Sequence, residues 1–362
     1  MAVLGALLIL LILWDTFETI VIPKLVERRV RLSTIYYRFV WQVWHFVTDR
    51  LPAGQLRASA LMSFGALCII FLFAVWGTVL IVGFGLVHMG IGDLGFAANF
   101  RQYLYYSGVT FFTLGYGDMV ARSSLGQLVS VAEAGTGFGF LAIVISYIPI
   151  LYQAFSKREH FIIKMDSRFG SVPSAGVALR RFGGESAMSS MREFLKDAEQ
   201  WSSEQLEGYL SYPILAFYRS QHETQSWLSA MTAVLDLCAL VMAGADPLED
   251  WEHDLVFQAK ATFAMSRHVI VDLSYVFEDP PAEHAPGRLT QEERGRLLRR
   301  LEGAFGSVRS DFNERLDEFQ AMYEPYLIGL ARDLHFVLPS WTEGADAIDN
   351  WQQTAWDGSA HF

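Results

Sequence analysis

The chain has 362 residues, of which 52% are hydrophobic and only 19% are charged. This composition is too apolar for an ordinary soluble enzyme of this size and indicates a membrane protein. The net charge of −11 is uneven: residues 1–156 contain 9 Lys and Arg against 7 Asp and Glu, and residues 157–362 contain 19 against 32. We therefore expect a membrane half and an acidic soluble half, whose charge argues against nucleic acid as a partner.

Residues 2–22 form an apolar run that ends near Pro23. No Lys or Arg precedes the run, so it lacks the basic start of a secretory signal, and we expect an additional membrane helix. Asp15 and Glu18 interrupt it. Acids within a span are costly and often functional, but we favour the simpler interpretation that both lie near the cytoplasmic interface. Their basic partners would then follow at Lys24, Arg28 and Arg29.

Residues 24–57 contain seven basic and two acidic residues, and the positive-inside rule places them in the cytoplasm. Within this stretch, residues 32–48 have the spacing of an amphipathic helix. Its polar face consists of Arg38, Gln42, His45 and Asp49, and its apolar face of Ile35, Phe39, Val43 and Phe46. We expect a helix that lies in the membrane interface. The alternative is a third membrane crossing over 32–48, which the polar face disfavours.

Residues 59–87 carry no charged side chain and are long enough for a tilted membrane crossing. A short glycine-rich outer loop follows at 88–99. A short helix over 101–112 and the segment 113–118 then re-enter the membrane from outside. Irregular backbone at that depth is tolerated only where it is buried in protein or lines an aqueous path.

The segment 113–118 reads Thr-Leu-Gly-Tyr-Gly-Asp, so Gly115 and Gly117 alternate with larger residues. A potassium ion loses its water shell only where other oxygen atoms replace it in a narrow pore. Backbone carbonyls do this when successive residues point theirs in one direction. Such a backbone requires left-handed conformations, which glycine tolerates. The segment therefore predicts a potassium selectivity filter.

Residues 125–152 form the second flanking helix, and the basic residues after it place its end in the cytoplasm. Gly137 is either a hinge or a close-packing residue, and the sequence does not separate the two. Counting from Gly137 by helical spacing, we expect Leu141, Ile145 and Pro149 to approach the pore axis. Pro149 either bends the helix near a cytoplasmic gate or ends it, because proline removes a backbone donor.

Glu133 lies within this apolar inner helix. One interpretation is that it holds water or a hydrogen bond behind the filter or pore helix. The other is a satisfied buried carboxyl that has no effect on gating. Both interpretations stay open at the level of sequence.

Residues 58–155 resemble the potassium channel pore family. The resemblance rests on the filter sequence with its two flanking spans, and on the pore-helix residues Tyr105, Tyr106, Ser107 and Thr110. It implies that the Thr113 hydroxyl and a set of backbone carbonyls bind K⁺. These carbonyls belong to Thr113, Leu114, Gly115 and Tyr116. It further implies that Gly117 shapes the mouth, and that Asp118, Thr110 and one of the two tyrosines support the filter from behind.

Two positions depart from the family pattern. Leu114 stands where valine is commoner; we still expect its carbonyl to face the pore and its side chain to pack behind it. Val109 stands where some members have a pore-helix glutamate, so gating that depends on that acid is not expected. One filter segment per chain implies a homotetramer in membrane lipid, with K⁺ as the permeant ion and no cofactor.

The second half of the chain has a helical pattern. Residues 246–249 and 290–293 carry helix-start signals. Residues 231–244 are apolar but too short to span a membrane, and they contain Asp236, so we expect a buried core helix. His268 and Asp272 offer too few ligands for a metal site. We find neither a dinucleotide-binding glycine fingerprint nor a nucleophile–base pattern, and predict no enzyme activity.

The sequence therefore predicts an all-α membrane protein with a tetrameric potassium-channel pore. Residues 1–57 form the extra and interfacial helices, 58–155 the pore, 156–186 a linker and 187–362 an α-helical cytoplasmic domain. The predicted function is passive, K⁺-selective transport across the cell membrane, with a cytoplasmic C-terminus. We expect the cytoplasmic domain to bias gating, through a ligand that the sequence does not identify. The alternatives are that this domain is only an assembly scaffold, or that the chain is receptor-like with a vestigial pore.

Overall fold

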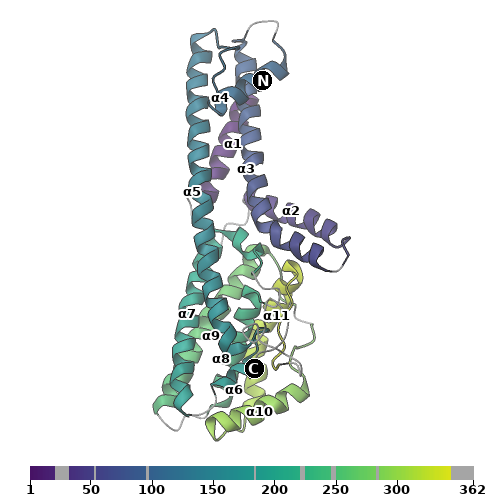
Figure 1. Ribbon diagram of the computed structural model, residues 1–362, viewed down its shortest axis with the longest axis vertical. Helices are drawn as coiled ribbons and strands as arrows, with labels where there is room; N and C mark the ends of the chain where they lie inside the picture. Colours follow the sequence, from purple (N-terminus) through teal and green to yellow (C-terminus); the bar gives the residue numbers. More distant parts are fainter. Residues whose placement is uncertain are drawn as a thin grey trace, which may run out of the picture. The chain divides into compact units, whose positions relative to one another are not determined.

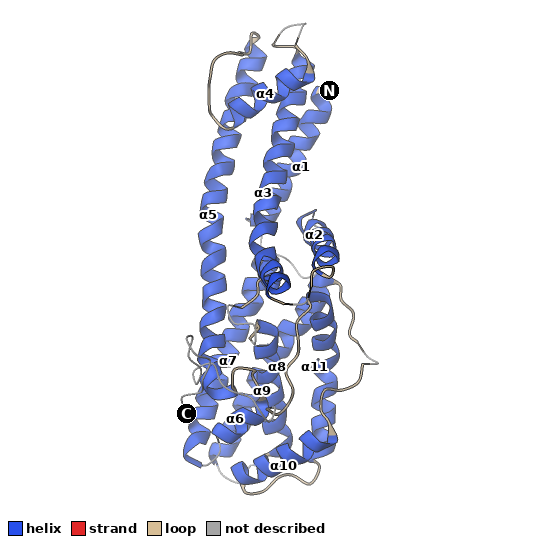
Figure 2. Ribbon diagram, turned by 45° about the vertical axis from the view of Figure 1, so that its right-hand side comes forward, coloured by secondary structure: helices blue, strands red, loops and turns tan. Residues whose placement is uncertain are grey.

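The computed structural model describes residues 1–20, 32–52, 54–94, 98–182, 185–220, 225–245, 250–282 and 285–343. Within these ranges every regular element is a helix, which confirms the all-α prediction (Figure 1, Figure 2). Among these residues, four helices are long and apolar enough to cross a membrane. The chain divides into two compact units, Met1–Gln153 and Ala154–Phe362.

The first unit contains α1 (Ala2–Ile20), α2 (Leu32–Thr48), α3 (Gln55–Ile91), α4 (Phe100–Phe111) and the start of α5 (Ser124–Phe169). Helix α1 runs alongside α3 in both views (Figure 1, Figure 2). The contact depends on small residues: a Cβ added at Gly5 would lie 2.3 Å from the carbonyl oxygen of Gly83, and one at Gly90 would lie 2.6 Å from Ala2. Small residues let membrane helices approach this closely.

Asp15 is buried against α3, and its predicted place near the cytoplasmic interface stays a prediction. It is 3% exposed and accepts a hydrogen bond of 2.9 Å from the indole nitrogen of Trp76 on α3. A buried indole N–H needs an acceptor, and a carboxylate on the neighbouring helix supplies it. Glu18 lies on the same helix and is half-buried. The basic residues that we expected as partners lie outside the described residues.

Helix α2 packs against the first part of α3 through aromatic side chains. The Trp41 and Phe64 ring centroids are 4.7 Å apart, and the Trp44 indole donates to the carbonyl of Ala60 at 3.1 Å. The expected apolar stripe lies on an exposed face, with Phe39 64% and Phe46 61% exposed. With 17 residues the helix is about 25 Å long, shorter than the hydrocarbon layer of about 30 Å. This length is at the lower limit for a span, so the interfacial helix stays a prediction.

The second unit holds the end of α5 and α6 (Ala175–Arg181), α7 (Glu185–Ser211), the 3₁₀ helix η1 (Pro213–Phe217) and α8 (Trp227–Gly244). It also contains α9 (Asp250–Phe277), α10 (Gln291–Phe305) and α11 (Phe312–Leu334). Every residue of α8 is buried, as expected for a core helix. The predicted capping box at Thr290 and Glu293 is present, whereas residues 246–249 lie outside the described residues.

The predicted linker is more ordered than its composition indicates. Helix α5 continues to Phe169, and α6 follows with its first five residues buried. The Ser174 side chain caps α6 and donates to the carbonyl of Trp341 at 3.0 Å. Small residues such as Gly176 are therefore needed for close packing, because a Cβ there would lie 2.8 Å from the carbonyl oxygen of Trp341.

The buried acid of α8 is satisfied by a polar cluster. Asp236 is 1% exposed, lies 2.7 Å from the Arg288 guanidinium and accepts from the Tyr323 hydroxyl at 2.6 Å. Arg288 also lies 3.0 Å from Glu324. Burial alone would lower the pKa of Arg288, but the Asp236 carboxylate raises that pKa above its usual value. The cluster joins α8, α11 and the loop before α10.

Candidate functional site

The segment 113–118 follows the short helix α4, whose N-terminus is capped. Asn99 caps α4 in a reciprocal capping box: its side chain accepts from the Gln102 amide at 3.1 Å, and its own amide donates to the Gln102 side chain at 2.8 Å. Helix α4 has 12 residues and is about 18 Å long, too short to cross the hydrocarbon layer.

The backbone of 113–117 alternates in handedness. The φ angles of Thr113, Gly115 and Gly117 are +56°, +62° and +76°, whereas Leu114 and Tyr116 have no positive φ. Positive φ is ordinary for glycine but a genuine outlier for a β-branched residue such as Thr113. Such outliers persist where surrounding structure imposes them and gather at functional sites.

Hydrogen bonds to the end of α4 hold the start of this segment. The Thr113 amide donates to the carbonyl of Thr110 at 3.0 Å, and the Leu114 amide donates to the carbonyl of Val109 at 2.9 Å. Thr110 thus supports the segment through its backbone. Beyond this point the side chains are open in the single chain, with Leu114 54% and Tyr116 67% exposed. The chain by itself does not supply the surface expected behind Leu114.

Asp118 ends the segment and contacts the pore helix. Its carboxylate accepts from the Tyr105 hydroxyl at 3.0 Å and from the Met119 amide at 3.1 Å. Of the two tyrosines proposed as its partner, Tyr105 makes this contact. Tyr106 instead lies 2.6 Å from the hydroxyl of Ser130 on α5.

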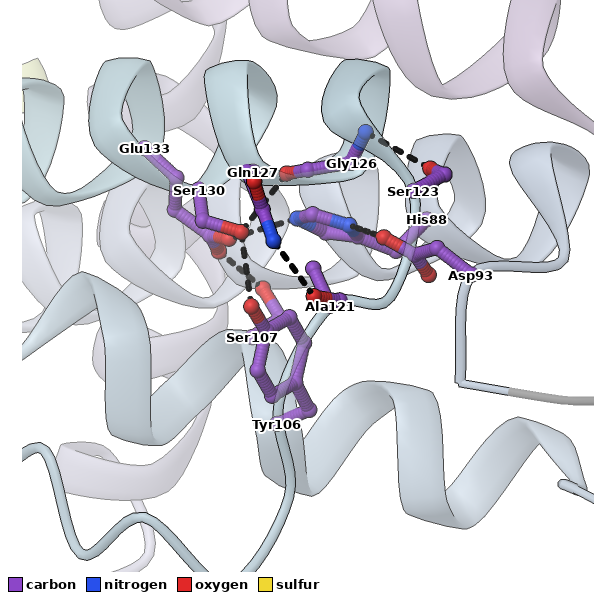
Figure 3. Close-up of polar contacts among 10 residues, drawn as sticks. All are labelled: His88, Asp93, Tyr106, Ser107, Ala121, Ser123, Gly126, Gln127, Ser130 and Glu133. Carbon is purple, nitrogen blue, oxygen red and sulfur yellow. Dashed lines mark hydrogen bonds and ion pairs between the residues drawn. The ribbon is translucent and has the colours of Figure 1, made fainter.

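A buried polar chain lies behind α4 (Figure 3). Glu133 of α5 contacts the Ser107 hydroxyl on α4 and lies 3.1 Å from Nε2 of His88 on α3. Nδ1 of His88 is 2.8 Å from Asp93 in the outer loop. Glu133 thus contacts the pore helix, as the first of the two interpretations predicted. Our sequence reasoning missed His88 and Asp93; the available signal was a histidine that ends an uncharged span, followed five residues later by an acid.

Residues 79–154 match the family model Ion_trans_2, described as an ion channel. The match supports a pore domain of the two-helix, potassium-channel type over this segment. Searches of curated proteins and of solved structures gave no match to the chain.

Within the pore domain, Gly137 lies where α5 touches the end of α4. A Cβ at Gly137 would lie 1.8 Å from the carbonyl oxygen of Phe111, whereas one at Gly135 or Gly139 would meet nothing within 4 Å. Close packing therefore accounts for Gly137. The hinge stays a prediction, and α5 is continuous through this position.

The expected pore-facing residues differ in exposure along α5, and their approach to a pore axis stays a prediction. Gly137 is buried, Leu141 is half-buried, Ile145 is 70% exposed and Pro149 is exposed. With 3.6 residues per turn, each step of four residues rotates the position by about 40°, so three steps from Gly137 turn it by about 120°. Pro149 lies inside α5 rather than at its end.

Proposed function

We propose that the chain forms a potassium-selective channel whose filter is the backbone of 113–117. The observation that supports this most strongly is the alternation of φ at Thr113, Gly115 and Gly117 directly after a capped, short helix. Alternating handedness aims successive carbonyls toward one side of the strand. A narrow ring of such carbonyls replaces the hydration shell of K⁺.

In this proposal the carbonyls of Thr113, Leu114, Gly115 and Tyr116, with the Thr113 hydroxyl, coordinate K⁺. Gly117 shapes the outer mouth. Tyr105 holds Asp118, and through it the end of the filter, against α4. No bond is made or broken during transport: the ion exchanges water for carbonyl oxygens and moves down its electrochemical gradient.

A homotetramer completes the filter, because one chain supplies one strand and K⁺ must be surrounded. Large apolar side chains on α5 support assembly, with Val131 72% and Phe138 70% exposed. Exposed apolar area of this extent marks contact with protein or lipid. Neighbouring chains would also cover Leu114 and Tyr116.

We further propose that the outer loop faces outward, that the C-terminus is cytoplasmic and that the second unit biases opening. The basic stretch 24–57 and the basic residues after 156 support this orientation. Helix α5 enters the second unit without leaving the helical state, which gives that unit a direct connection to the pore. A ligand would control opening only by binding open and closed channels with different affinity. Titration of candidate ligands against single-channel open probability separates such a sensor from a scaffold.

The test uses the full-length protein in vesicles with opposed K⁺ and Na⁺ gradients. We expect a reversal potential near that of K⁺ and a tetrameric mass in mild detergent. Gly115→Ala should abolish K⁺ flux while the tetramer persists, because a Cβ disfavours φ of +62°. The matched control is Gly306→Ala, which imposes the same strain at φ +73° on the end of α10, outside the first unit. Selective currents through the Gly115 variant would refute the filter assignment.

A further inference from the structure

The polar side chains behind α4 make four contacts, and each contact needs a hydrogen atom. With His88 neutral and both carboxylates deprotonated, these groups have only two hydrogens to share. Three contacts run in series from Asp93 to His88, His88 to Glu133, and Glu133 to Ser107 (Figure 3). A fourth joins Ser107 to the carbonyl of Ile81 at 2.7 Å. His88, Ser107 and Glu133 are 0% exposed and Asp93 is 3% exposed. Solvent therefore does not satisfy any of these groups.

Each contact needs one hydrogen. A neutral imidazole has one N–H and a serine hydroxyl has one O–H, whereas carboxylates and the Ile81 carbonyl only accept. Two carboxylates with a neutral histidine therefore leave two of the four contacts without a hydrogen. Two further protons complete the chain, on His88 and on the oxygen of Glu133 that faces Ser107. These protons also bring the net charge of the buried cluster from −2 to zero, which burial favours.

The cluster joins the segments that surround the filter. Asp93 also accepts from the Arg122 amide through its backbone carbonyl at 3.1 Å, so it holds the loop after the filter. Its carboxylate lies against the first turn of α5, where a Cβ at Gly126 would be 2.1 Å from it. Ser107 belongs to α4, which the filter follows. Loss of a contact in this chain therefore loosens the pore helix or the outer mouth.

The titratable groups that contact His88 come from three elements: Asp93 from the outer loop, Glu133 from α5, and Tyr106 from α4, whose ring lies 5.0 Å from the imidazole. Helix α1 also packs on α3, and it presents small residues to this end of α3. Asp15 of α1 contacts Trp76 instead, and Met1 at its outer end is 69% exposed.

We propose that His88 and Glu133 are positioning residues for conduction, and that protons shared along this chain hold the pore helix and outer mouth in the conducting arrangement. As pH rises, this set of polar side chains loses a proton and with it one hydrogen bond. The conducting state is then disfavoured. The proposal rests on the proposed channel function. Losing one hydrogen bond to a charged group corresponds to about a tenfold or greater change in the ratio of conducting to non-conducting channels.

The experiment measures K⁺ flux into vesicles with the same pH on both sides, between about pH 6 and about pH 9, the range around ordinary imidazole titration. We expect wild-type flux to fall about tenfold with rising pH. Glu133→Gln keeps a donor toward Ser107 and an acceptor toward His88 at every pH, so its flux should fall less. His88→Phe removes both imidazole contacts and should give low flux that does not vary with pH. The control is His45→Gln, which disrupts another histidine–aspartate pair, with Asp49 at 2.8 Å just after α2, and should keep the wild-type profile.

A second readout separates this proposal from the proposed function. Hydrogen exchange of the α4 amides should quicken with rising pH, beyond the intrinsic rate increase, in the wild type and less so in Glu133→Gln. If the wild type conducts no K⁺ but shows this exchange pattern, channel function fails while the proton-dependent contact stands. A wild-type flux that is independent of pH, or a Glu133→Gln profile identical to that of the wild type, overturns the proposal.

Discussion

Gly137→Ala tests the contact between the inner helix and the pore helix. The added Cβ would lie 1.8 Å from the carbonyl oxygen of Phe111 and 2.7 Å from its carbonyl carbon, where real Cβ contacts are not found below 3.0 Å. Relief requires about 1.2 Å of separation between α5 and α4, the difference between 1.8 and 3.0 Å. The obstructing atoms are backbone, so no side-chain rotation relieves the clash.

The expected loss of stability follows from two opposing effects. Overpacking a well-filled site costs typically about 1–3 kcal/mol, and a backbone neighbour places this site toward the upper end. Alanine is favoured over glycine within a helix by only about 0.5–1 kcal/mol, so the steric cost dominates. Phe111 is 0% exposed and lies two residues before Thr113. The displacement therefore reaches the filter, and we expect K⁺ flux to fall as well.

The assay compares thermal dissociation of the proposed tetramer and K⁺ flux in vesicles for Gly137→Ala and for Gly135→Ala. At Gly135 a Cβ meets nothing within 4 Å in the chain, so that variant should be as stable as the wild type or more stable. Equal stability and equal flux in the two variants would refute the packing argument. Altered opening without a loss of stability in Gly137→Ala would instead support the hinge.

Two further predictions concern the gate and the second unit. Ile145→Asn should raise the resting open probability in single-channel recordings, because a polar ring keeps a narrow pore hydrated. The control Ile145→Val should not raise it. Unchanged opening in the Asn variant would place the gate elsewhere. Arg288→Met should destabilise the second unit by about 3–5 kcal/mol, because Asp236 would be left buried without its cation. Loss of hydrogen-exchange protection in α8 measures this, and Arg192→Met is the control, since its pair with Asp254 is exposed. Equal protection in both variants would contradict the argument.

The features of the fold that the sequence predicted correctly depend on short local patterns. Helix α8 was expected to be a core helix because it is apolar yet contains Asp236, and the capping box at Thr290 is a signal within four residues. The alternation of Gly115 and Gly117 with larger residues indicated a backbone that needs left-handed conformations, and both glycines have positive φ. In each case the physical cause lies within a few neighbouring residues.

Contacts between distant residues were decided only by the tertiary structure. Asp15 meets Trp76 across 61 residues, and Glu133 meets His88 across 45. Sequence spacing gives the order of positions around one helix, but not the rotation of that helix against its neighbours. This rotation determines that Gly137 contacts Phe111 while Ile145 stays exposed. The sequence by itself thus determined most of the helices, though not α6 in the predicted linker, and where glycine is needed. Packing decided which side chains meet, because that depends on how whole helix faces fit together.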